Sequence, residues 1–208
     1  MSDSTGRHLE TEQKWDAAAD FTVPDLSSLE GRAKPAGRHR IYLSATYFDT
    51  EELDLLKNRI TLRRRVGGAD EGWHLKLPVR QDTRQEIRAA LGDGDTAAVP
   101  AELAAQVKDV IGGRPLHPVA ILDTERTVLT LTSQAGQPLA EVADDLVTAT
   151  RLDEPGAEPV RWREIEVEAA ENSADAPRVL EAVGRALREA GATRSSSASK
   201  LGRLLGVG

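Results

Sequence analysis

Apolar and polar residues alternate along most of this chain, which is the pattern of β-strands that bury one face. The alternation predicts eight strands, near residues 8–16, 40–48, 59–66, 73–79, 83–91, 118–132, 138–150 and 160–170. Turn-forming residues separate several of these strands. Because the connections are short, neighbouring strands are expected to run antiparallel, since a parallel crossover needs about a dozen or more residues.

Apolar residues at helical spacing predict a few helices between the strands. The predicted helices, in chain order, are 51–58 (the weakest), 100–113, 176–191 and 197–206. The last would be capped by Ser197 or Ser199, because a serine at that position accepts a hydrogen bond from the first turn. Residues 24–38 predict a loop, or a short helix followed by a loop. The fold class is therefore α+β, and the 208 residues could form one large domain or two small ones.

Charged residues share a face on most of the predicted strands, because residues two apart in a strand point the same way. The shared faces carry Glu10, Glu12 and Lys14; Arg63 and Arg65; His74 and Lys76; Arg84, Glu86 and Arg88; Glu141 and Asp145; and Glu164, Glu166 and Glu168. On any single strand such a face more often contacts water.

An inverted barrel is the alternative, with apolar faces packed outward under helices and charged faces lining the interior. Eight strands enclose a space about as wide as one small ligand. Buried charges are costly unless they are paired or meet a ligand of opposite charge. A polyphosphate with divalent metal ions would satisfy both signs, since carboxylates bind the metal while lysine and arginine bind phosphate. The alternation alone does not choose between the two barrels.

Composition excludes several classes of protein. The net charge of −7 argues against broad nucleic-acid binding. The chain contains no cysteine, which excludes disulfides, thiolate metal sites and a cysteine nucleophile. No apolar run approaches the roughly 20 residues of a membrane span, and the start of the chain lacks a signal peptide's apolar region. A cytoplasmic protein is the simplest expectation.

Eight short motifs resemble, in order, those of the CYTH family, a branch of the triphosphate tunnel metalloenzymes. "ETEQK" at 10–14 resembles the family's ExExK signature. The others are "YFDT" (47–50), "TLRRRVGG" (61–68), "GWHLKLP" (72–78), "TRQE" (83–86), "AEVADD" (140–145), "REIEVE" (163–168) and "SASKL" (197–201). The resemblance implies that residues 1–208 form one domain, a closed eight-stranded antiparallel β-barrel whose charged faces point into a tunnel, with helices packed outside.

The resemblance also implies roles for individual residues. The metal ligands would be Glu10, Glu12, Asp145, Glu164 and Glu166, which would hold one or two Mg²⁺ or Mn²⁺ ions. The residues that bind the triphosphate would be Lys14, Arg63, Arg65, Lys76, Arg84, Arg126 and Lys200, and the catalytic residues Lys76, Glu164 and Glu166. Asp145 is preferred to Asp144 because it shares a face with Glu141. Glu86, Glu141 and Glu168 have the inward parity, and their role is left open.

Metal-dependent hydrolysis of inorganic triphosphate is the expected activity. A nucleoside base or a thiazolium ring usually needs an aromatic face to stack on. Trp15 and Trp73 have outward parity, and only Trp162, at a strand end, has inward parity. The alternatives are a class IV adenylyl cyclase that converts ATP to cyclic AMP and pyrophosphate, a thiamine triphosphatase, and a non-catalytic polyphosphate-binding module.

Three of the motifs resemble in particular the CYTH part of bacterial CYTH–CHAD proteins. These are "GWHLKLP", "AEVADD" and "SASKL". A CHAD domain, a helical domain associated with polyphosphate, could therefore follow in the same chain. The expected ligands are tripolyphosphate, a nucleoside triphosphate or polyphosphate, with no nucleic-acid and no membrane partner.

Overall fold

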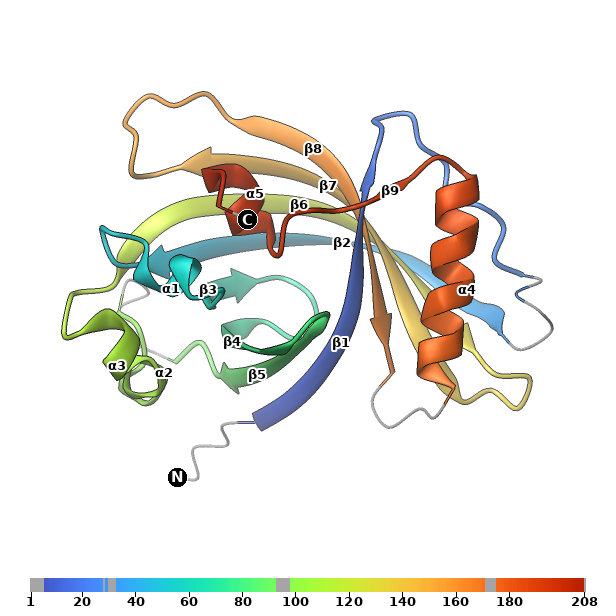
Figure 1. The fold of residues 1–208 in the computed structure, drawn as a ribbon, viewed down its shortest axis with the longest axis horizontal. Coiled ribbons are helices and arrows are strands. Elements are labelled where there is room, and N and C mark those ends of the chain that lie inside the picture. Colours follow the sequence, from blue (N-terminus) through green and yellow to red (C-terminus); the bar gives the residue numbers. More distant parts are fainter. Residues whose placement is uncertain (1–5, 28, 30–32, 93–97, 171–174, 208) are drawn as a thin grey trace.

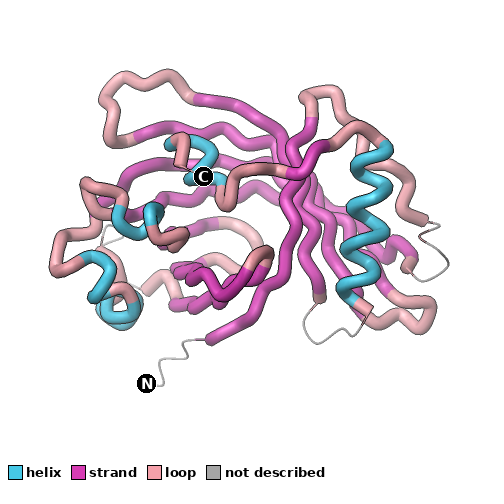
Figure 2. The backbone as a smooth tube through the Cα atoms, in the orientation of Figure 1, coloured by secondary structure: helices cyan, strands magenta, loops and turns pink. Residues whose placement is uncertain are grey.

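The computed structural model describes residues 6–27, 29, 33–92, 98–170 and 175–207 (Figure 1). Its strands are β1 (Gly6–Ala17), β2 (Lys34–Asp49), β3 (Thr61–Val66), β4 (Gly72–Arg80), β5 (Thr83–Ala89), β6 (His117–Thr132), β7 (Pro138–Arg151), β8 (Val160–Ala169) and β9 (Thr193–Arg194). Its helices are α1 (Asp54–Lys57), α2 (Ala101–Gln106), α3 (Lys108–Ile111), α4 (Ala176–Glu189) and α5 (Lys200–Leu205). Strands dominate the backbone, as Figure 2 shows.

Eight strands close into an antiparallel barrel in the order β5-β4-β3-β2-β6-β7-β8-β1, and β1 pairs with β5 to complete the ring. The first strand closes the ring because its two halves pair with different strands. Gly6 to Thr11 pair with β5, and Glu12 to Ala17 pair with β8. The short β9 pairs with β1 at Trp15 and Asp16, outside the ring. The predicted fold class, α+β with a closed eight-stranded barrel, is confirmed.

All eight predicted strands are present, but β2 begins earlier than expected. The prediction of a loop over residues 24–38 is wrong for its last part, because β2 starts at Lys34; residues 28 and 30–32 lie outside the described part of the chain. Pro35 and Gly37 gave this stretch the appearance of a loop. They instead flank a register shift in the ladder with β6, where a strand tolerates proline and glycine.

The predicted helices are present, with altered limits. The segment 100–113 forms two short helices, α2 and α3, which meet at Val107. The Ser199 hydroxyl caps α5 by accepting a hydrogen bond from the Gly202 amide at 3.0 Å. None of the helices that the structure describes has both the length and the apolar character of a membrane-spanning segment.

Helices cover the outer face of the barrel on two opposite sides (Figure 1). On one side, α4 packs Val183 and Leu187 against Trp15, Ile165 and Val167 of β1 and β8. On the other side, α1, α2 and α3 cover Phe48, Leu62, Trp73, Leu75 and Ile87. The apolar faces of the strands therefore point outward, which leaves the opposite faces to line the interior.

One end of the interior is apolar, which the expectation of a charged lumen did not foresee. Ala45, Tyr47, Leu122 and Val147 have the inward parity of their strands and form one buried cluster with Leu201 of α5. Helix α5 therefore contributes to an apolar plug, and Lys200 at its first turn is also buried.

The contact between α4 and β1 leaves no room for a side chain at Gly184. A Cβ atom there would lie 2.8 Å from Cζ2 of Trp15 and 3.1 Å from Oε1 of Gln13. Gly184→Ala should therefore lower the free energy of unfolding by about 1–2 kcal/mol, although alanine is the better helix former. Urea unfolding measures this. Gly37→Ala, which meets nothing within 4 Å, is the control. A Gly184→Ala variant as stable as the wild type would contradict this packing.

Candidate active site

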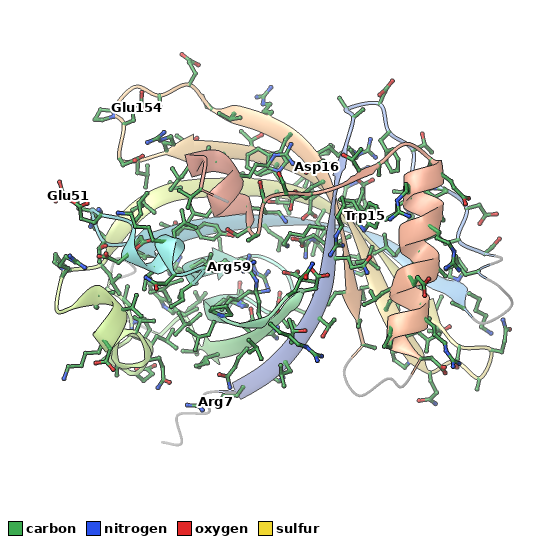
Figure 3. The ribbon with its side chains drawn as sticks, in the orientation of Figure 1. Arg7, Trp15, Asp16, Glu51, Arg59 and Glu154 are labelled. Carbon is green, nitrogen blue, oxygen red and sulfur yellow. The ribbon has the colours of Figure 1, made fainter. Side chains whose placement is uncertain are left out.

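A cavity of about 650 Å³ occupies the interior of the barrel. Eight lysine or arginine residues and seven aspartate or glutamate residues line it, together with a small apolar group. In Figure 3 many side chains that carry nitrogen or oxygen project into the space between β1 and the strands behind it. Tyr47 is the only tyrosine, tryptophan or phenylalanine among the described residues of the lining.

The ladder register determines which lumenal charges lie side by side. Arg126 on β6 lies opposite Asp145 on β7, which in turn lies opposite Glu164 on β8. Lys14 lies opposite Glu166, since β1 and β8 pair there. Residues opposite each other in an antiparallel pair have neighbouring side chains on the same face. Antiparallel pairing thus places Arg126 and Lys14 next to carboxylates, and it also places Asp145 next to Glu164.

Three carboxylates gather beside the plug, on β7 and β8. Asp145, Glu164 and Glu166 each present an oxygen, and these oxygens lie within 4.8 Å of one another. The ammonium of Lys200 contacts all three, at 2.9, 2.7 and 2.8 Å. Arg126 donates two hydrogen bonds of 2.7 Å to Asp145 and one of 2.6 Å to Glu166.

This carboxylate cluster suits a divalent cation. Burial alone would raise the pKa of Asp145, but Arg126 and Lys200 lower it below its usual value. The pKa of Glu166 is lowered likewise, by Lys14, Lys200 and Arg126 against burial. Both groups are therefore ionised, and convergent carboxylate oxygens are the ligands that Mg²⁺ and Mn²⁺ prefer. The residues present fit such an ion.

A second group of charges lies on β1, β4 and β5. Lys76 contacts Glu10 closely and lies 3.7 Å from Glu86. Arg88 also contacts Glu86, and it lies 3.3 Å from Glu10. His74 approaches Glu86 with Nδ1 at 2.8 Å and the Asp70 carbonyl oxygen with Nε2 at 2.9 Å, which fixes the orientation of its ring. Glu86 is thus held by three neighbouring side chains.

Glu12 connects the two groups. Lys14 lies 3.2 Å from Glu12 and also contacts Glu166 of the carboxylate cluster. Burial would raise the pKa of Glu12, but Lys14 and Lys76 lower it to about 2. Glu12 is therefore ionised at any ordinary pH.

The arginines of β3 carry positive charge that the protein only partly balances. Arg63 donates a hydrogen bond to the Tyr47 hydroxyl at 3.3 Å, and Arg65 pairs with Asp70. The Nε atoms of Arg63 and Arg65 are buried and have no hydrogen-bond partner among the described residues. Burial, with Arg63 and Arg126 nearby, lowers the pKa of Arg65 to about 9. This wall of the cavity therefore favours an anionic ligand.

Most of the residues singled out from the sequence meet in this cavity. Those that line it are Glu10, Glu12, Lys14, Arg63, Arg65, Lys76, Arg84, Glu86, Arg126, Glu141, Glu166, Glu168 and Lys200. Asp145 and Glu164 are buried behind the lining, in contact with Lys200. Asp144 instead pairs with Arg163 at 2.8 Å, away from the cavity.

The five carboxylates expected to hold metal do not form one cluster. Asp145, Glu164 and Glu166 lie together, whereas Glu10 pairs with Lys76 and Arg88. The separation follows from the register of β1, because Glu10 lies opposite Arg84 of β5 while Lys14 lies opposite Glu166 of β8.

Sequence reasoning gave no role to three further residues of the cavity. Arg88 shares a face with Arg84 and Glu86, so its parity was a usable signal. Tyr47 lies within a recognised motif, but its contact with Arg63 depends on the pairing of β2 with β3. Asp70 lies in the turn after β3, where no alternation applies.

Comparison with known proteins agrees with this architecture. Two uncharacterized proteins of Mycobacterium tuberculosis, Rv2226 and MT2285, are 39% identical over 212 residues. The match covers 97% of this chain, which spans 41% of the length of these relatives.

Solved structures share the fold. A candidate adenylate cyclase from Bacillus halodurans superposes with a TM-score of 0.64 at 17% identity, over 95% of this chain and 98% of that one. A candidate adenylyl cyclase from Hippeastrum, for which a dominant triphosphatase activity is described, superposes with a TM-score of 0.57 at 18% identity, over 95% of each chain.

The CYTH domain family matches residues 10–205, which is nearly the whole chain. A CHAD domain within these residues is not supported, since the CYTH match occupies them. The order of the strands, the charged interior and this match agree, and the chain belongs to the CYTH family.

Proposed function

We propose that this protein hydrolyses inorganic triphosphate in its tunnel, in a reaction that depends on Mg²⁺ or Mn²⁺. The observation that carries the proposal is the pairing of a convergent carboxylate cluster with buried arginines whose charge is only partly balanced. A polyanion that arrives with a divalent cation matches both features. The triphosphatase activity described for the Hippeastrum relative supports the same assignment.

Positioning and electrostatic stabilisation provide most of the catalysis of phosphoryl transfer. Arg63 and Arg65, with Lys76 and Arg84, would bind the phosphate oxygens and hold the chain of phosphates in line. Asp145, Glu164 and Glu166 would hold Mg²⁺ or Mn²⁺, which supplies polarisation of a phosphoryl oxygen when bound. Glu10 and Glu12 are further carboxylates of the cavity, on β1, the strand next to β8.

Lys200 and Arg126 would change partners when substrate enters. In the structure they neutralise Asp145 and Glu166. A bound triphosphate would offer them phosphate oxygens, and a divalent ion would take over the neutralisation of the carboxylates. The two lysine and arginine side chains would then stabilise negative charge on the transferring phosphoryl group.

A bare phosphate chain suits the cavity better than a nucleotide. Trp162 donates a hydrogen bond to Glu164 at 2.7 Å and stacks against Arg203, so its ring is already engaged. Tyr47 interacts with Arg63 through its hydroxyl. Neither ring offers a free face of the kind that a base or a thiazolium stacks on.

The first test is phosphate release from tripolyphosphate, ATP and thiamine triphosphate, each with Mg²⁺ and with Mn²⁺. Tripolyphosphate should be preferred by about tenfold or more in kcat/KM, because the cavity lacks a stacking face for the other two. Pyrophosphate appearing in step with cyclic AMP would instead identify a cyclase. Binding without release from any of the three would identify a polyphosphate-binding module.

Lys76 and Glu164 are the residues whose replacement should be most damaging. Lys76→Met and Glu164→Gln should each lower kcat/KM for tripolyphosphate by about 100-fold or more, because the first removes a cation that would bind phosphate and the second a carboxylate that would hold the metal ion. Matched controls are Lys57→Met and Glu154→Gln, whose side chains are 57% and 63% exposed. Thermal unfolding checks that each variant is folded. Full activity in both Lys76→Met and Glu164→Gln would overturn the assignment.

Glu168, in the lining of the cavity, has a strongly raised pKa. Burial, with Glu10 nearby, raises the pKa of Glu168 from 4.5 to about 7. Between these values the folded protein keeps a proton that the unfolded chain releases. Protonated Glu168 therefore stabilises the folded protein, and the free energy of unfolding falls as the pH rises from about 4.5 through about 7.

Glu168→Gln should remove this dependence, because glutamine does not titrate. The melting temperature of the variant relative to wild type should rise between about pH 5.5 and about pH 8, measured without divalent metal. Glu154→Gln, on the exposed turn after β7, should show no such trend. A constant difference between Glu168→Gln and wild type across this range would contradict the raised pKa.

A further inference from the structure

A second cavity, of about 340 Å³, adjoins the tunnel. The two share Glu12, Lys14 and Arg84 in their linings, so the second continues from the first at β1 and β5. Its other walls are the turn between β4 and β5 (78–83) and the segment 194–198, which leads from β9 to α5. The cavity thus forms an antechamber to the tunnel, and we call it by that name below.

The antechamber is strongly cationic, although the whole chain has a net charge of −7. Five lysine or arginine residues line it, against two carboxylates. One of those carboxylates, Asp82, pairs with Arg194 at 2.6 Å, and the other, Glu12, lies 3.2 Å from Lys14. The remaining arginines have no carboxylate partner in the lining.

Arg59, Arg80 and Arg194 line the antechamber and not the tunnel, and of these only Arg194 pairs with a carboxylate of the lining. Arg59 and Arg80 are exposed, and Arg80 uses only its Nε atom, which donates to the Thr83 hydroxyl at 3.0 Å. The Arg59 side chain makes no hydrogen bond or ion pair within the described part of the chain. In Figure 3 it appears between α1 and β1.

The backbone around the antechamber is fixed by tight turns. Arg59 has a φ of 60° and Asp82 a φ of 58°, in the left-handed region that few non-glycine residues adopt. Ser195, Ser196 and Ser197 contribute hydroxyl groups to the opposite wall, and the Ser195 amide is held by the Lys14 carbonyl at 2.9 Å. Hydroxyls and guanidinium groups are donors that suit phosphate oxygens.

We propose that the antechamber binds the phosphate units of a linear polyphosphate that extend beyond the three held in the tunnel. This inference rests on the proposed function of the tunnel and extends its ligand class to phosphate chains longer than triphosphate. Lys14 and Arg84, which face both cavities, would contact the phosphates at the junction. The extra units would form ionic contacts with Arg59 and Arg80 and undergo no chemistry there.

The test compares Arg59→Asn/Arg80→Ala with wild type, because asparagine tolerates the left-handed backbone at residue 59. The control, Arg40→Ala/Arg151→Ala, removes the same charge from β2 and β7, outside both cavities. Dissociation constants are measured by calorimetry for tripolyphosphate and for a chain of about 14 phosphates, and kcat/KM for tripolyphosphate with Mg²⁺. A long chain can place any of its phosphates in the tunnel, which raises its apparent affinity for every variant by the same factor. Comparing the variants with the same ligand cancels this factor.

The antechamber variant should bind the long chain about tenfold more weakly than the control does, because two charge-assisted contacts are lost. Its kcat/KM for tripolyphosphate should stay within about twofold of wild type, since neither arginine lines the tunnel. Equal affinity of variant and control for the long chain would overturn the inference. A lower kcat on tripolyphosphate with unchanged long-chain affinity would also overturn it, in favour of an exit for product phosphate.

Failure of the proposed function gives a different result. If wild type binds tripolyphosphate but does not hydrolyse it with either metal, the proposed triphosphatase activity is overturned. In that case, weaker binding of the long chain by the variant than by the control would still support phosphate binding in the antechamber.

Discussion

Charge compensation inside a closed barrel is the constraint on which the rest of this structure depends. Carboxylates and cations are individually costly to bury, and the register sets Arg126 opposite Asp145 and Lys14 opposite Glu166 across the ladders. A one-residue shift in the register of a strand would turn the lumenal charges of that strand into the apolar layer outside. Lys200 has a special place in this balance, since it contacts three carboxylates from a helix that is no part of the sheet.

Charges buried in the tunnel add little to the stability of the folded protein, so apolar packing has to provide it. Apolar side chains on the outside of the barrel are buried by α4 on one side and by α1, α2 and α3 on the other. The apolar plug at one end contributes a third cluster. The barrel wall therefore separates two environments, an apolar one beneath the helices and an ionic one in the tunnel. The strands are held in place by the apolar clusters on their outer face, and the charged side chains on their inner face are thereby kept in defined positions.

Much of the fold could be predicted because alternation of period two marks antiparallel strands clearly. The same parity distinguishes Asp145, which faces inward, from Asp144, which pairs with Arg163. The inside of the barrel could not be told from the outside by alternation, since both faces are regular; the resemblance to a family was needed. Asp70 was out of reach because it lies in a turn. The separation of Glu10 from Glu166 was out of reach because it depends on which strands flank β1 after closure.

The first strand also has a consequence for how the chain folds. β1 pairs with β5, β8 and β9, so its partners are spread over almost the whole sequence. Contacts of such long sequence separation slow folding, because much of the chain must be ordered before they form. During synthesis β1 emerges long before β8 and α5, so the ring cannot close, nor Lys200 reach its carboxylates, until nearly all these residues have left the ribosome. Until then Lys14 lacks Glu166 and Asp145 lacks Lys200, whereas pairs within one hairpin, such as Arg126 with Asp145, can already form.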